Sequence, residues 1–145
     1  MHHRTLRLAL AGLALCLGAS AQASTCGRIS TFDIAPRTEN LFAAVLIAVN
    51  GNLPGPTTAD QWRLPPGRHT LTVAEAIDAN RFLASQNRER DGRRTRDRYK
   101  TLVVEVEPGI TYRLAARLIP EGRSLVRRNA HWEPVIWKQS PEPCG

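Results

Sequence analysis

Hydrophobic and polar residues alternate with a period of two along much of the chain after residue 24, as they do in half-buried β-strands. In residues 101–107 (TLVVEVE), for example, Leu102, Val104 and Val106 share one face. Residues 41–49 (LFAAVLIAV) form an unbroken apolar run before Asn50-Gly51, which predicts a strand buried on both faces. The remaining expected strands are residues 28–34, 62–64, 68–77, 110–119 and 131–138.

Turns rich in proline and glycine separate these segments. Pro66-Gly67 precedes residues 68–77, Pro108-Gly109 precedes residues 110–119, and residues 120–123 form a third expected turn. Six or seven short strands joined by such turns predict an all-β fold, most simply a small β-sandwich. The length after residue 23 suits a single domain, residues 24–145.

Two segments carry a family resemblance. Residues 66–73 (PGRHTLTV) and 108–114 (PGITYRL) each lead from a Pro-Gly turn into an alternating strand. This pattern resembles the PEGA-type and carboxypeptidase-regulatory-like modules of bacterial envelope proteins, over about residues 41–119. The resemblance implies an immunoglobulin-like β-sandwich with a binding or structural role and no catalytic residues. Residues 78–100 depart from the compact pattern of that family as a charged insertion.

Residues 1–23 have the organisation of a secretory signal peptide. Arg4 and Arg7 precede the apolar residues 8–17 (LALAGLALCL), and Ala21-Gln22-Ala23 provides the small residues that signal peptidase reads. The apolar run is much shorter than the roughly 20 residues that cross a bilayer as a helix. We therefore expect cleavage after Ala23, no transmembrane segment in the mature chain, and a periplasmic or secreted protein.

The three cysteines have different expected fates. Cys16 leaves with the signal peptide, and Leu15 stands where a lipobox requires a small residue, which argues against a lipoprotein. Cys26 and Cys144 remain near the two ends of the mature chain. An even pair in an oxidising compartment predicts a disulfide, which would bring the first and last elements side by side.

Residues 78–100 (DANRFLASQNRERDGRRTRDRYK) concentrate the positive charge. The chain has a net charge of +7, and this segment holds eight basic and four acidic residues. Interspersed acidic residues favour a solvated hairpin extension or mobile loop, with Asp91-Gly92 as its turn. Alternatively, the arginines bind a polyanion, because a guanidinium binds phosphate through two parallel hydrogen bonds. The candidate polyanion-binding residues are Arg88, Arg90, Arg93, Arg94, Arg96 and Arg98.

Other ligand classes find less support in the sequence. Nucleic acid is disfavoured because the arginines lack interleaved aromatic side chains and the chain is expected to be exported. Zinc is disfavoured because the mature chain keeps two histidines, His69 and His131, and two cysteines that we expect to be bonded. His69 is in phase with Leu71 and Val73, which predicts a core-facing side chain.

Catalysis is weakly indicated. The sequence has no G-x-S-x-G, H-E-x-x-H, P-loop or G-x-G-x-x-G motif, and we expect no cofactor. A cleft that joins His69 or His131 to a carboxylate would support a small hydrolase. Trp62, Trp132 and Trp137 are expected to pack in the core; exposed, they would form a stacking platform for a ligand.

These observations predict an exported, non-enzymatic binding or accessory module of the bacterial envelope. Its expected partner is an envelope protein or an anionic envelope polymer, and not nucleic acid. One alternative is a polyanion-binding protein that uses arginines 81–100 to hold lipopolysaccharide, anionic lipid or acidic glycan. A second alternative is the small hydrolase.

Overall fold

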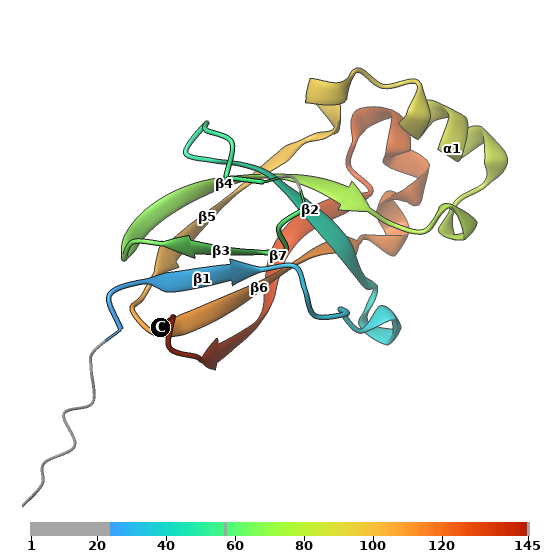
Figure 1. The fold of residues 1–145 in the computed structure, drawn as a ribbon. Coiled ribbons are helices and arrows are strands. Elements are labelled where there is room, and N and C mark those ends of the chain that lie inside the picture. Colours follow the sequence, from blue (N-terminus) through green and yellow to red (C-terminus); the bar gives the residue numbers. More distant parts are fainter. Residues whose placement is uncertain (1–23, 57, 145) are drawn as a thin grey trace, which may run out of the picture.

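The computed structural model describes residues 24–56 and 58–144, so the expected signal peptide and its cleavage site lie outside the described residues. Strands dominate the fold, as expected for an all-β protein, and short helices cluster at one end (Figure 1). The strands are β1 (Gly27–Ser30), β2 (Leu41–Val49), β3 (Gln61–Leu64), β4 (Gly67–Ala76), β5 (Lys100–Val106), β6 (Ile110–Leu118) and β7 (Trp132–Pro141). The helices are η1 (Arg37–Glu39), η2 (Ala79–Arg81), α1 (Ala84–Asp91), η3 (Thr95–Arg98) and η4 (Pro120–Arg128).

The seven strands form one sheet that bends at β2. Its order is β3-β1-β6-β2-β4-β5, with β7 paired to β6. Strands β1 and β6 are parallel, and the other strand pairs are antiparallel. Strand β2 pairs with β6 only through Leu41 and Phe42 and then follows β4 from Ala43 onward. We call β3-β1-β6-β7 the β6 half of the sheet and β2-β4-β5 the β4 half.

Side chains from both halves fill one hydrophobic core. Each strand points alternate residues inward, because successive side chains of a strand lie on opposite faces of the sheet. Trp132 of the β6 half and Leu71 of the β4 half have no exposed surface. The β6 half also contributes Ile29, Trp62, Tyr112, Leu114 and Leu118, and the β4 half contributes Phe42, Leu46, Val73, Val104 and Val106.

The tryptophans pack rather than form a platform. Trp132 lies in the main core and Trp62 is 9% exposed, whereas Trp137 is half-buried in a second cluster with Leu41 and Ala115. Trp137 sits where the pairing of β7 with β6 shifts by one residue, at a bulge. Trp132 and Trp137 therefore contribute to separate clusters.

The expected strands exist, but three details differ. The prediction that residues 41–49 are buried on both faces is wrong: Val45 is 48% exposed, because the outer face of the strand is only partly covered. The first strand ends at Ser30 instead of residue 34. The third expected turn, residues 120–123, is the start of η4.

Residues 78–100 are neither a simple hairpin nor an extended loop. They form η2, α1 and η3, and α1 packs against η4 at the end of the molecule opposite the C-terminus (Figure 1). The Asp91-Gly92 position ends α1, where the Gly92 N–H donates to the Arg88 carbonyl. Within the described residues, no helix is long and apolar enough to span a membrane.

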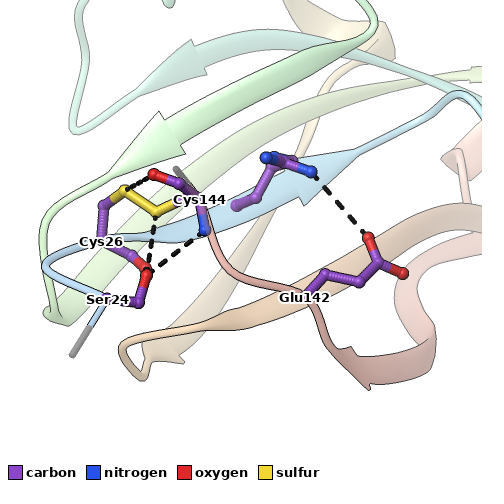
Figure 2. Close-up of a disulfide and its surroundings, with 5 residues drawn as sticks. Ser24, Cys26, Glu142 and Cys144 are labelled. Carbon is purple, nitrogen blue, oxygen red and sulfur yellow. Dashed lines mark hydrogen bonds and ion pairs between the residues drawn. A yellow bond between two sulfur atoms is a disulfide. The ribbon is translucent and has the colours of Figure 1, made fainter. Parts of the chain in front are cut away.

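Cys26 and Cys144 form the expected disulfide, with their Cα atoms 6.0 Å apart (Figure 2). The Ser24 hydroxyl donates to the Cys26 carbonyl and accepts a hydrogen bond from the Cys144 N–H, at 3.1 and 3.3 Å. Beside it, Glu142 lies 3.9 Å from the Arg28 guanidinium. The disulfide thus ties the chain ends at the side of the molecule away from the insertion.

Candidate functional site

The insertion is anchored to the sheet by an ion pair between β4 and α1. The Arg90 Nη2 donates to both carboxylate oxygens of Glu75, at 2.8 and 2.9 Å, and its Nε donates to one of them at 3.0 Å. The Ile77 N–H donates to the same carboxylate at 2.7 Å. Both charged side chains are mostly buried, at 14% and 12% exposure. We call this arrangement the Glu75–Arg90 clamp.

Two rings pack on the clamp. The Arg90 guanidinium lies 4.1 Å from the centre of the Phe82 ring, and the His131 ring meets the Phe82 ring edge-on at 5.4 Å. His131 Nε2 is 3.6 Å from the Glu75 carboxylate. His131 is 1% exposed, and neither ring nitrogen has a hydrogen-bond partner within the described structure. The clamp and these two rings pack together where the insertion meets the sheet.

The electrostatics of the clamp keep Glu75 ionised. Burial alone would raise the pKa of the Glu75 carboxyl, since burial disfavours the charged form. The His131 side chain, the Ile77 N–H and the Arg90 guanidinium lower it, and the net effect is a pKa below the ordinary value. Arg90 is therefore held by a carboxylate at neutral pH.

A second group of contacts fixes the insertion to η4 and to Asn129, the residue that caps its C-terminal end. Arg93 donates to the carbonyls of Val126 and Arg127, the latter at 3.0 Å. The Asn129 amide donates to the Asp97 carbonyl at 3.0 Å. These residues lie more than 30 positions apart in the chain, so only the folded structure brings them together.

A cavity of about 390 Å³ opens between the insertion and the outer side of β2 and β4. We call it the arginine cavity, because three arginines of the insertion line it. Its size is in the range of small-molecule sites. Its charged lining residues are three arginines and two carboxylates, Arg90, Arg93, Arg98, Glu75 and Asp91. Val45, Ile47, Tyr99 and His131 also line it.

The cations beside this cavity differ in their partners. Glu75 neutralises Arg90, whereas Arg93 and Arg98 donate to backbone carbonyls, Arg98 to those of Asp91 and Arg93. Lys100, next to the insertion, donates to the Trp132 carbonyl and lies over the Trp132 ring. Within the described structure, none of these last three cations has a carboxylate in hydrogen-bond contact.

The pKa of Lys100 is lowered mainly by burial. The Glu133 carboxylate opposes that effect, and the positive charge of Arg93 lowers the pKa further. The charges of Lys100 and Arg93 therefore act on each other. Such a group of charges attracts an anion.

The six arginines predicted from the sequence fall into three groups. Arg90 is an internal anchor, and Arg93 and Arg98 line the cavity. Arg88 and Arg94 are exposed on the insertion, and Arg96 is an exposed side chain 3.8 Å from Asp97. The structure thus brings three of the six to the cavity, Arg90 among them, and neutralises Arg90 through Glu75.

His131 and the Glu75 carboxylate both line the cavity, and a histidine beside a carboxylate in a cleft is the arrangement that would support a hydrolase. Both oxygens of Glu75 are already engaged by Arg90 and the Ile77 N–H, and His131 is almost fully buried. These contacts suit a structural anchor. His69 is buried as expected, with its ring nitrogens near the Asn50 amide and the Pro65 carbonyl, at 3.0 and 2.8 Å.

Sequence reasoning missed Glu75, Phe82 and Asn129. A signal for Glu75 was present: it continues the inward-facing series of Leu71 and Val73, where a carboxylate requires a buried partner. Phe82 and Asn129 gave no local signal, because their partners are distant in the sequence. A search of the described residues finds no group of three or more side chains that could hold a metal ion.

Comparisons of the chain with protein-family models, with curated proteins and with solved structures find no match.

Proposed function

We propose that this protein is an exported, non-enzymatic binding module whose partner is an anionic molecule of the bacterial envelope, held at the arginine cavity. One observation carries the proposal: Arg93 and Arg98 line the cavity with hydrogen bonds to neutral carbonyls instead of carboxylates, and Lys100, outside the cavity lining, also donates to a carbonyl. A phosphate or carboxylate at this place would supply the missing negative charge. The hydrogen bonds of guanidinium groups to such anions are also stronger than neutral ones.

The export part of the proposal is supported by the chain ends. The Cys26–Cys144 disulfide fits an oxidising compartment, where such bonds persist. The pattern of residues 1–23 supports a signal peptide. The two halves of the bent sheet share one core, and the Pro-Gly turns start β4 and β6. We infer from these features an immunoglobulin-like, PEGA-like sandwich that presents the insertion at one end.

Affinity for a soluble polyanion tests the proposal. The protein, purified after export from an expression host, is titrated into fluorescently labelled polyphosphate at several salt concentrations. We expect binding that weakens as salt rises, because exposed charges are screened. The double variant Arg93→Gln, Arg98→Gln should bind at least tenfold more weakly, since the amide keeps a hydrogen-bond donor but removes the charge.

The matched control removes the same charge elsewhere. Arg68 and Lys138 are exposed and lie outside the insertion, so Arg68→Gln, Lys138→Gln has the same net charge as the test variant. We expect its affinity to fall less than threefold. An equal loss in both double variants would reduce the effect to net charge and contradict a defined site.

A further inference from the structure

A second cavity, of about 350 Å³, lies where β2 leaves β6 to follow β4. The loop between β2 and β3 forms part of its wall, and none of the described residues that line it is charged. We call it the apolar cavity. Val45, Ile47, Leu53, Pro54 and Trp62 are among its lining residues.

The apolar cavity and the arginine cavity share a wall. Val45 and Ile47 line both, so the two cavities adjoin across these β2 side chains. Val45 is 48% exposed and Leu53, on the loop, is 83% exposed. Exposed apolar side chains mark a binding surface when they are contiguous, and Val45 and Leu53 line one hollow beside the arginine cavity.

The two cavities together indicate the chemistry of one occupant. The arginines of the first cavity favour a negatively charged group, and the apolar lining of the adjoining cavity favours a hydrocarbon group. An acidic glycan would neutralise the arginine cavity but leave Leu53 and Val45 exposed in the apolar cavity. An apolar peptide segment would fill the apolar cavity but leave Arg93 and Arg98 without a counter-charge.

We propose that the ligand is an anionic lipid, bound with its phosphate headgroup in the arginine cavity and an acyl chain in the apolar cavity. This inference rests on the proposed function and deepens it by naming the class of anion. The headgroup contacts Arg93 and Arg98, and the chain passes over Val45 and Ile47 toward Leu53 and Trp62. No covalent step is involved.

A series of alkyl phosphates tests the inference. Inorganic phosphate, hexyl phosphate, octyl phosphate and neutral octyl glucoside are titrated into the exported, purified protein below their micelle-forming concentrations, with calorimetric detection. Each methylene that becomes fully buried should strengthen binding about fourfold. We therefore expect octyl phosphate to bind about sixteenfold more tightly than hexyl phosphate, and octyl glucoside to bind far more weakly.

One exposed position separates the roles of the cavities, because Leu53 lines the apolar cavity and not the arginine cavity. Leu53→Ser should remove most of the chain-length dependence while leaving the affinity for inorganic phosphate unchanged. Val103 and Ile34 are also exposed, at 49% and 89%, but line neither cavity. Val103→Ser and Ile34→Ser are therefore controls that should behave as the parent protein.

The outcomes distinguish this inference from the proposed function. Phosphate binding without chain-length dependence would overturn the lipid inference and leave the proposed function standing. An absence of binding to both polyphosphate and every alkyl phosphate would overturn the proposed function as well. Equal affinity for octyl glucoside and octyl phosphate would overturn headgroup recognition. A dimer in sedimentation that Leu53→Ser dissociates would assign the apolar cavity to a second copy and overturn the inference.

Discussion

Glu75 at the end of β4 and Arg90 in α1 are joined by three hydrogen bonds of 2.8 to 3.0 Å in a largely buried ion pair. They are 15 positions apart, and the chain between them contains the start of the insertion. A basic segment that could have been a solvated extension is therefore part of the folded domain. Its position over β2 and β4 creates the arginine cavity.

The clamp predicts a large loss of stability on substitution. Glu75→Gln leaves the Arg90 guanidinium mostly buried without its carboxylate, and breaking one side of a buried pair costs about 3 kcal/mol or more. Urea unfolding measures the change. Arg117→Gln is the control, because its pair with Glu133 is about half exposed and such pairs contribute less than about 1 kcal/mol. Equal effects of the two substitutions would contradict the anchoring role of the clamp.

We expect the ionisation of Glu142 to make the stability of the fold depend on pH. Hydrogen bonds from Arg113 and then Ser140 lower its pKa from 4.5 to about 2. A carboxyl with a lower pKa in the folded state stabilises the fold above its unfolded pKa. That contribution is complete above about pH 4.5 and is lost as the pH falls toward 2.

The test is urea unfolding between pH 2 and pH 6. Glu142→Gln should lower stability at pH 6 and make the decline toward pH 2 shallower than in the parent protein. Glu105→Gln, an exposed carboxylate on β5, is the control for loss of one charge. A parallel decline in the Glu142→Gln and parent proteins would argue against the ionic contacts of Glu142.

We expect the protonation of the Lys100 amino group to depend on whether the ligand is bound. Burial and then the charge of Arg93 lower its pKa, with Glu133 opposing, and a bound anion favours the ammonium form. The pKa of Lys100 should therefore rise when alkyl phosphate saturates the protein. Carbon-13 NMR of the lysine side chains follows the titration, and the chain has only Lys100 and Lys138 to assign. An unchanged pKa at saturation would place the anion elsewhere.

We expect the disulfide to stabilise the fold and to have no role in binding. In the chain-entropy model, closing a loop with a sequence separation of 118 contributes about 5 kcal/mol. The free energy of unfolding of the Cys26→Ser, Cys144→Ser variant, measured by urea unfolding, should be lower by about that amount. Its affinity for polyphosphate should be unchanged, because the chain ends lie away from the insertion (Figure 1). A loss of affinity in folded variant protein would show that the ends and the cavity are coupled.

Much of the local structure could be predicted from the sequence. The alternation in β4, β5 and β6 depends on neighbouring residues alone, so it located these strands and the inward-facing His69. The cysteine pair was equally accessible, because two cysteines remain near the ends after the expected cleavage. The candidate site was located only as a basic segment, since charge counting does not show which carboxylate or carbonyl each arginine meets.

The sequence by itself determined the strand pattern, the closure of the chain ends and the place of the charged insertion, because each follows from residue type and spacing. The tertiary structure decided which arginines are neutralised: Arg90 meets Glu75, whereas Arg93 meets carbonyls 33 and 34 positions away. It also decided that one face of β2 is only partly covered, since the burial of a strand depends on the segments that pack on each of its faces. The side chains on that face, Val45 and Ile47, join the two cavities because distant segments fold over the same strand.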